Sequence, residues 1–331
     1  MKVVITGGAG FLGKKLARRI LQQGTLAGPD GTPAKVSELL LFDVGKASGP
    51  GLDDPHVKAI AGDIANVATV QTIVQGASTV FHFAAVVSAG AEADFDLGYR
   101  VNLDGTRAVL DACRALGTAP RVVFASSLAV YGGALPPMVG DDTALTPQTS
   151  YGTQKAIGEL LVNDYSRKGF VDGRALRLPT VVVRPGRPNR AASTFASSMI
   201  REPLAGQDAI CPVSPETVMA LASPRRIVAG LVHALGIPGE LFGTSRSLQL
   251  PGFSVSVGEM AAALRRAGGE AAYVRLRWQP DPQIQAIVSS WPPSLATPRA
   301  EALGFGRDNG IDEVVEAFIE DDLPLQRELA G

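Results

Sequence analysis

The chain has 331 residues, of which 46% are hydrophobic and 19% are charged, a composition typical of a globular enzyme with one large domain or two lobes. The net charge of −1 and the scattered basic residues argue against a nucleic-acid partner. No apolar run approaches the ~20 residues that a membrane span needs, and the initial MKVVITGGAG lacks the apolar core of a signal peptide. We therefore expect a cytoplasmic protein without a membrane partner.

Apolar runs alternate with amphipathic segments along the first half of the chain. We predict strands at 2–6, 38–43, within 56–64, and at 78–85, 121–127 and 173–186, the last including its exit loop. We predict helices at 11–23, 103–117 and 151–169, and an exposed loop at 25–37. Continuous apolar strands that alternate with helices are typical of an α/β protein with a Rossmann-type, doubly wound parallel sheet.

The pattern changes after about residue 186. Helical segments at 194–201, 224–235, 256–267 and 311–321 mix with short strands and many prolines. We therefore predict a dinucleotide-binding domain at 1–186 that also carries the catalytic residues. Residues 187–331 are expected to form a smaller mixed α/β substrate-binding lobe, interleaved with the end of the Rossmann sheet.

The segment ITGGAGFLGKKL places three glycines where the first strand turns into the first helix. Gly7 permits the tight turn, Gly10 permits close approach of a diphosphate to the helix N-terminus, and Gly13 permits close packing of helix and strand. Phe11 and Leu12 lie between them. This loop follows a strand and opens a helix, so we predict a dinucleotide-binding site.

The second strand ends in Asp43, whose carboxylate can bind the adenosine ribose hydroxyls and repel a 2′-phosphate. We therefore predict NAD rather than NADP as cofactor. The spacing from Gly13 is 30 residues, longer than the usual ~20, and the segment at 25–37 accounts for the excess. The alternative is an ordinary acid at the end of a strand.

Further cofactor contacts are expected at the ends of later strands. Asp63 and Ile64 are placed to flank the adenine, and the small residues Ala84 and Ala85 end the fourth strand where the cofactor must pass closely. Pro179 and Thr180 are expected near the nicotinamide.

Three side chains are expected to meet at the carboxyl edge of the sheet. Ser127 ends the fifth strand, and Tyr151 and Lys155 lie four residues apart at the start of the next helix, so both face the same side of it. A phenol with a pKa near 10 is a weak base, but an ammonium one turn away favours the phenolate. We predict Tyr151 as proton acceptor, Lys155 as its partner and a ribose contact, and Ser127 as a hydrogen-bond donor to the substrate oxygen.

The sequence resembles a known family, the extended short-chain dehydrogenase/reductases, also called NAD-dependent epimerase/dehydratases. The similar motifs are TGGAGFLG (6–13), HFAA (82–85), VNLDGT (101–106), SSLAVYG (126–132) and SYGTQKA (150–156). The resemblance implies the same roles for the serine, tyrosine and lysine, places Asn102 in the cofactor region, and suggests a homodimer. Ser126 is close enough to touch the nicotinamide, although a strand-end hydroxyl explains it equally well.

The stretch 150–207 and the segment SPRRIVAGLVHAL (223–235) resemble the branch of this family that oxidises D-erythronate. The resemblance implies NAD-dependent oxidation of the C2 hydroxyl of this four-carbon aldonic acid. Arg184, Arg187 and Arg190 follow the sixth strand, and a guanidinium there can bind either a carboxylate or a pyrophosphate. The predicted substrate contacts are Ser88, Ser127, Tyr151, Arg184 and Arg187.

Two other functions fit parts of the pattern. A nucleotide-sugar epimerase or dehydratase would use the same fold with a tightly bound NAD that is regenerated. A dinucleotide-binding redox sensor would need only the Rossmann half, and the serine–tyrosine–lysine set argues against it. The two dispersed cysteines and three histidines offer neither a disulfide framework nor metal-ligand spacing, so we predict no metal.

Overall fold

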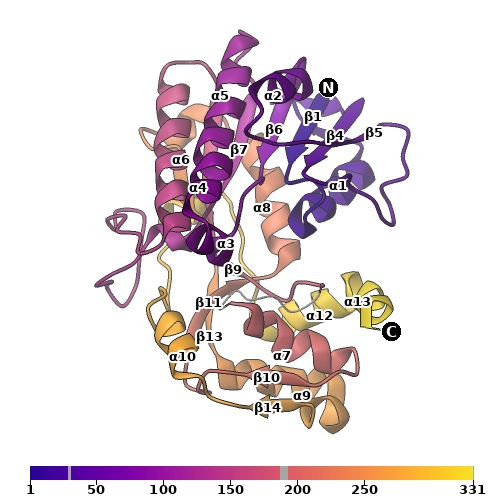
Figure 1. Cartoon of the computed structure of the whole chain (residues 1–331), viewed down its shortest axis with the longest axis vertical. Coiled ribbons are helices and arrows are strands. Elements are labelled where there is room, and N and C mark those ends of the chain that lie inside the picture. Colours follow the sequence, from indigo (N-terminus) through magenta and orange to yellow (C-terminus); the bar gives the residue numbers. More distant parts are fainter. Residues whose placement is uncertain (29–30, 187–192, 331) are drawn as a thin grey trace. The chain divides into compact units, whose positions relative to one another are not determined.

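The computed structural model describes residues 1–28, 31–186 and 193–330. By its contacts the described chain divides into two compact units (Figure 1). The sheet unit comprises residues 1–130, 147–178 and 228–249, and the second unit comprises 131–146, 179–227 and 250–331. The chain thus enters each unit more than once. The boundary at residue 186 stays a prediction.

A parallel sheet forms the centre of the sheet unit. Within the described residues it has seven strands in the order β12-β8-β7-β6-β1-β4-β5. The strands are β1 (Lys2–Thr6), β4 (Glu38–Asp43), β5 (Val57–Ala61), β6 (Ala77–His82), β7 (Arg121–Ser127), β8 (Asp172–Leu178) and β12 (Ser247–Gln249). Every neighbouring pair is parallel. The predicted Rossmann-type sheet is therefore confirmed.

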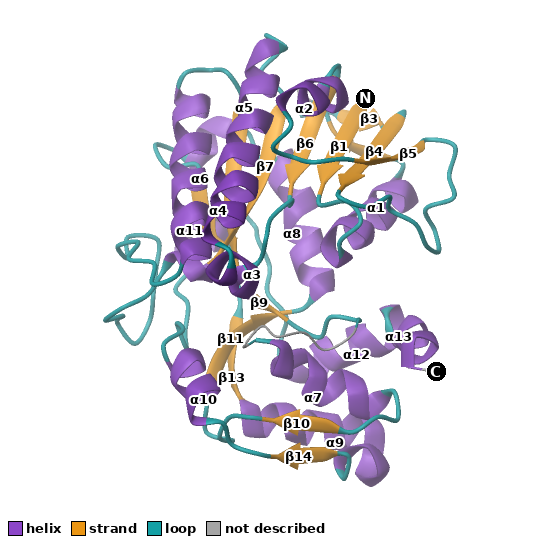
Figure 2. Cartoon of the chain, viewed as in Figure 1, coloured by secondary structure: helices purple, strands orange, loops and turns teal. Residues whose placement is uncertain are grey.

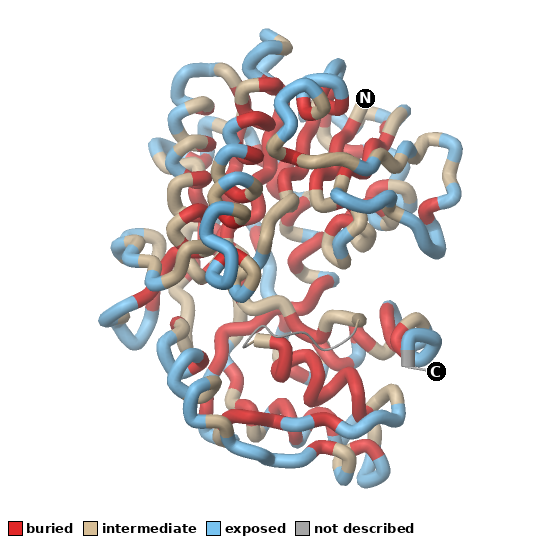
Figure 3. The backbone as a smooth tube through the Cα atoms, viewed as in Figure 1, coloured by how far each residue is buried: buried red, intermediate tan, exposed pale blue. Residues whose placement is uncertain are grey.

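Helices cover both faces of this sheet (Figure 2). Helices α2, α5 and α6 lie on one face, and α1 and α8 lie on the other. Their bounds, with those of the short helices between them, are α1 (Phe11–Gln23), α2 (Val67–Val74), α3 (Ser88–Ala93), α4 (Phe95–Gly98), η1 (Tyr99–Asp104), α5 (Gly105–Ala115), η2 (Leu128–Val130), α6 (Ser150–Arg167), α8 (Pro224–Gly236) and η3 (Gly239–Phe242). Covered on both faces, the inner strands are mostly buried, which explains their continuous apolar sequence, whereas the edge strand β5 has no buried residue (Figure 3).

The segment at 25–37 differs from the predicted loop. It forms an antiparallel hairpin of β2 (Thr25–Ala27) and β3 (Pro33–Lys35). Leu26 is buried, and the guanidinium of Arg121 donates to the carbonyls of Ala27 and Gly28. A buried arginine and the buried side chains of Leu26 and Val36 therefore hold the insertion onto the sheet unit.

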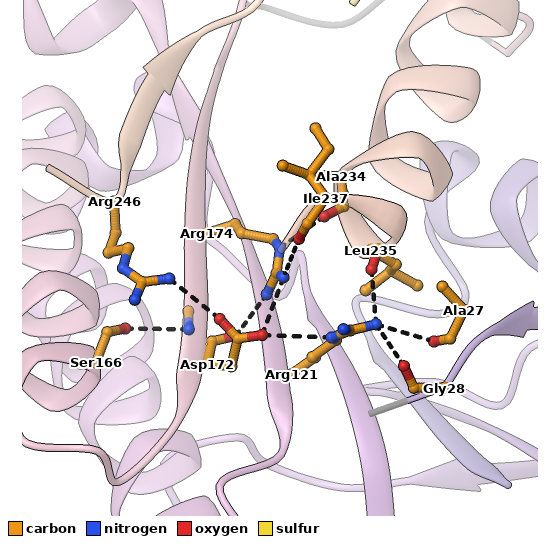
Figure 4. Close-up of polar contacts among 11 residues, drawn as sticks. Ala27, Gly28, Arg121, Ser166, Asp172, Arg174, Ala234, Leu235, Ile237 and Arg246 are labelled. Carbon is orange, nitrogen blue, oxygen red and sulfur yellow. Dashed lines mark hydrogen bonds and ion pairs between the residues drawn. The ribbon is translucent and has the colours of Figure 1, made fainter. Parts of the chain in front are cut away.

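Arginines gather around Asp172 at the start of β8 (Figure 4). Arg121, Arg174 and Arg246 each form an ion pair with its carboxylate. Arg121 and Arg174 also donate to carbonyl groups at the end of α8 and just beyond it, those of Ala234, Leu235 and Ile237. The positive charges of the buried guanidiniums are thus balanced by one carboxylate and by carbonyl groups at the negative end of the α8 dipole.

The second unit has its own apolar core, which includes Val183, Met199, Leu221, Leu264 and Phe318. Its strands are β9 (Thr180–Val181), β10 (Ala209–Cys211), β11 (Val218–Ala222), β13 (Phe253–Ser256) and β14 (Leu276–Trp278). Its helices are α7 (Thr194–Leu204), α9 (Val257–Tyr273), α10 (Pro282–Ser289), α11 (Pro298–Ala302), α12 (Ile311–Asp321) and α13 (Leu323–Ala330). No helix in the described part of the chain is long and apolar enough to cross a membrane.

Candidate active site

The glycine loop after β1 is packed too tightly for any side chain. A Cβ at Gly13 would lie 2.4 Å from the carbonyl oxygen of Gly7, and a Cβ at Gly7 would lie 2.8 Å from the amide nitrogen of Ala84. Gly7 also has a φ of +71°, in the left-handed region that favours glycine. Glycine at these two positions therefore permits the tight turn from β1 into α1, the turn on which diphosphate binding at this helix N-terminus depends.

Asp43 holds this loop in place. One carboxylate oxygen accepts from the amide of Ala9 at 3.0 Å, and the other accepts from the amide of Val44 at 2.8 Å. The side chain therefore lies beside the glycine loop at the end of β4. Each oxygen keeps a lone pair for a ribose hydroxyl, so the arrangement fits the predicted contact with adenosine.

The residues predicted to flank the adenine have different surroundings. The Asp63 carboxylate accepts from the amide of Ala65 and forms an ion pair with Arg100 of η1, and both interactions lower its pKa. Ile64 is buried in the core of the sheet unit, where a Cβ at Gly105 would lie 2.8 Å from its side chain. The proposed adenine contacts of Asp63 and Ile64 stay predictions.

A hydrogen-bonded chain joins β1, β6 and η1 behind the glycine loop. His82 Nδ1 lies 2.7 Å from the Thr6 hydroxyl, and Nε2 lies 2.9 Å from the Thr106 hydroxyl. Thr106 itself donates to the carbonyl of Asn102, so it accepts from a proton on Nε2. Burial lowers the pKa of His82 to about 3, with a smaller contribution from the Lys155 charge. His82 is therefore neutral and fixed in one tautomer.

Asn102 is bound on all sides by protein groups. Its amide nitrogen donates to the Val86 carbonyl and to Gln154 of α6, and its oxygen accepts from the Val86 amide. These bonds fix the backbone just after Ala84 and Ala85 relative to α6. Asn102 thus holds the chain after β6 in place, and its predicted contact with the cofactor stays a prediction.

Helix α6 packs against η2, the short helix that directly follows Ser127. The Ser127 hydroxyl accepts from the amide of Ala129 at 3.1 Å. Thr149 caps the N-terminus of α6, and a Cβ at Gly152 would lie only 2.0 Å from the carbonyl oxygen of Ala129. The glycine next to Tyr151 thus lets the first turn of the helix touch the loop that follows Ser127.

Lys155 is buried under aromatic rings. Its ammonium lies 4.6 Å from the centre of the Phe124 ring and 5.6 Å from that of Tyr151. The side chain is 3% exposed, and this burial lowers its pKa to about 7, while the carboxylate of Glu159 acts in the opposite direction. The tyrosine and lysine therefore share one helix face, as their spacing predicts.

The remaining predicted residues lie in several elements. Ser126 is buried and donates to Glu159 at 2.5 Å, whereas Ser88 begins α3. Pro179 and Thr180 follow β8 in the second unit. Arg184 has its amide bonded to Ser197 and its carbonyl to Arg201. Arg187 and Arg190 lie outside the described residues.

Comparison with known proteins shows the family. The profile of the NAD dependent epimerase/dehydratase family matches residues 3–226. The chain belongs to this family. Its members include a D-erythronate dehydrogenase of Cupriavidus necator, 56% identical over 322 residues that cover 97% of this chain and 98% of that protein. The D-erythronate dehydrogenase of Haemophilus influenzae is 45% identical over 98% of this chain and 100% of its own.

One solved structure has a backbone similar to nearly the whole of this chain. The nucleoside-diphosphate-sugar epimerase from Agrobacterium tumefaciens superposes with a TM-score of 0.92 at 43% identity, covering 98% of this chain and 95% of its own. The family match and the two dehydrogenases that match nearly the full chain identify this protein as an NAD-dependent dehydrogenase. Its cofactor is NAD.

Proposed function

We propose that this protein oxidises the C2 hydroxyl of D-erythronate to the 2-oxo acid. Bound NAD supplies the acceptor for the hydride that leaves C2. The hydroxyl proton passes to the Tyr151 phenolate, and the electron pair of the O–H bond forms the carbonyl. The products are the 2-oxo acid, NADH and one proton.

The observation that carries the catalytic part is the buried Lys155 ammonium beside the Tyr151 ring. A positive charge in a medium of low dielectric favours the phenolate over the phenol. Lys155 would also bind the nicotinamide ribose. Ser127 accepts from the Ala129 amide, so its own proton is left to donate to the substrate oxygen.

The choice of substrate rests on the two D-erythronate dehydrogenases that match nearly the full chain. A small hydroxy acid offers few contacts, so its carboxylate must supply much of its orientation. We propose Arg184 as the group that binds the carboxylate, with Arg187 as the alternative. The backbone of Arg184 is fixed on both sides, by Ser197 and by Arg201, which suits a guanidinium that must keep one position.

One observation favours a second function. The relative from Agrobacterium tumefaciens, 43% identical, is described as a nucleoside-diphosphate-sugar epimerase. An epimerase would use the same tyrosine and lysine, but NADH would not accumulate because the cofactor is regenerated in each turnover. The two functions therefore differ in a directly measurable product.

The test is NADH absorbance from purified enzyme with NAD and a panel of aldonic acids, their polyols and nucleotide sugars. We expect NADH from D-erythronate and little from erythritol, which lacks the carboxylate. Arg184→Met should penalise the acid far more than the polyol. Equal activity on acid and polyol would reject a carboxylate site, and conversion of a nucleotide sugar without NADH would establish the epimerase instead.

Two variants test the proposed roles on α6. Tyr151→Phe should lower kcat by about 10²–10⁴-fold and leave NAD affinity nearly unchanged. Lys155→Met should lower both, because the lysine has two roles. Tyr165→Phe is the matched control, since Tyr165 lies on the same helix but donates to Asp111 instead. Similar, mild effects of the first two substitutions would contradict the division of roles.

A further inference from the structure

A buried ion pair lies one helical turn beyond Lys155. Glu159 and Arg177 of β8 are 2% and 6% exposed. The guanidinium Nε donates to the two carboxylate oxygens at 2.9 and 3.1 Å, and Nη2 donates to one of them at 2.7 Å. Ser126, the neighbour of Ser127, adds a hydrogen bond from β7. One carboxylate of α6 is thus bonded to the carboxyl ends of two adjacent strands.

We propose that Glu159 is a positioning residue of the active site, which keeps the Lys155 ammonium charged and holds α6 against the ends of β7 and β8. The proposal rests on the roles proposed above for Tyr151 and Lys155. Residues four apart on a helix lie on the same face, so the carboxylate is directed toward the side of α6 that carries the ammonium. Glu159 itself contacts neither substrate nor cofactor in this proposal.

The surroundings of Lys155 explain why it needs such support. Burial beneath Phe124 disfavours its charged form, and Glu159 opposes that effect. The other titratable groups directed toward it are Tyr151 on its own helix and His82 on β6, which is neutral. On β8 the guanidinium of Arg177 contacts the same carboxylate, and its positive charge opposes part of the effect of Glu159 on Lys155. Arg100 and Asp104 of η1 are exposed to solvent.

The variant that tests the charge is Glu159→Gln combined with Arg177→Met. Glu159→Gln alone leaves a buried guanidinium without its carboxylate and can prevent folding, whereas removal of both charges is often tolerated. Glutamine also keeps an oxygen that can accept from Ser126. The matched control removes another buried pair, Arg201–Glu202 of α7, by Glu202→Gln with Arg201→Met.

The measurement is the titration of Lys155, followed by NMR of enzyme labelled with ¹³C at the lysine Cε and assigned by comparison with Lys155→Met. It needs no turnover. In the Glu159/Arg177 double variant we expect the midpoint to fall by up to about one pH unit relative to wild type, because removal of the guanidinium offsets part of the loss of the carboxylate. The decline of kcat at alkaline pH, where the ammonium is lost, should move by the same amount. The α7 control should leave the Lys155 midpoint as in wild type; its kcat does not serve as a control, because Arg201 also donates to the carbonyl of Arg184.

An unchanged Lys155 midpoint in a folded double variant would overturn the proposal, even if activity had fallen. A lower kcat without any shift of the pH profile would assign the ion pair a structural role only. Failure of the proposed function has a different signature, full activity in Tyr151→Phe, and the lysine titration remains interpretable in that case because it does not depend on the reaction.

Discussion

Acidification should destabilise this protein through His82. The ring is fully buried between the hydroxyls of Thr6 and Thr106, and burial lowers its pKa from 6.5 to about 3. The unfolded chain protonates the same residue near pH 6.5. Between pH 6.5 and about 3 the unfolded state therefore binds the additional proton, and the free energy of unfolding falls as the pH falls through this window.

The loss in the free energy of unfolding depends on how far the pH can be lowered below the pKa of His82 in the unfolded chain. Each pH unit below 6.5 costs about 1.4 kcal/mol of stability while the folded state stays neutral at this site. From pH 6.5 to about pH 5 the loss due to His82 is therefore about 2 kcal/mol. Most carboxylates remain ionised above pH 5, so their contribution is smaller there.

The assay is urea unfolding at pH 7 and pH 5 for wild type and for His82→Gln. Glutamine offers one acceptor and one donor group to the two threonine hydroxyls but does not titrate. Wild type should lose about 2 kcal/mol more than the variant between the two pH values, after the contributions common to both cancel. Equal losses in both proteins would refute a neutral, buried His82.

Two substitutions test the packing of the site, and a third tests its cofactor preference. Gly13→Ala places a Cβ 2.4 Å from the carbonyl oxygen of Gly7. The NAD dissociation constant measured by calorimetry should therefore rise about tenfold or more. Unchanged NAD affinity would contradict the tight packing of the glycine loop. A Cβ at Gly152 would lie 2.0 Å from the carbonyl oxygen of Ala129. Gly152→Ala should therefore lower kcat by a larger factor than it lowers NAD affinity, and equal losses would contradict a local effect on α6. Asp43→Ala should narrow the preference for NAD over NADP in kcat/KM, and wild-type enzyme that used NADP equally well would contradict the assignment.

The parts of the site that depend on local spacing were predictable. The glycine loop and Asp43 lie at a strand–helix turn and a strand end, and four residues separate Tyr151 from Lys155. Each of these patterns follows from the geometry of one or two consecutive elements. The structure places the tyrosine and lysine side by side, and their catalytic roles stay proposals.

The contacts that the sequence did not reveal join elements far apart in the chain. Glu159 meets Arg177 only because β8 pairs with β7 and α6 crosses both, so strand order decides the contact. Its spacing of four from Lys155 was the available signal, yet charged residues at that spacing are common on exposed helix faces. Likewise, His82 and Asn102 are recognisable in their motifs, but their partners Thr6 and Val86 depend on the packing of β1, β6 and η1.

The transfer of the C2 hydrogen is the most direct test of the proposed function. D-Erythronate carrying deuterium at C2 would be incubated with NAD and the wild-type enzyme, and the NADH formed would be analysed by mass spectrometry. We predict one deuterium in the nicotinamide ring of each NADH, and a rate that Tyr151→Phe lowers by about 10²-fold or more. NADH without deuterium would contradict oxidation at C2, and the absence of NADH would contradict a D-erythronate dehydrogenase altogether.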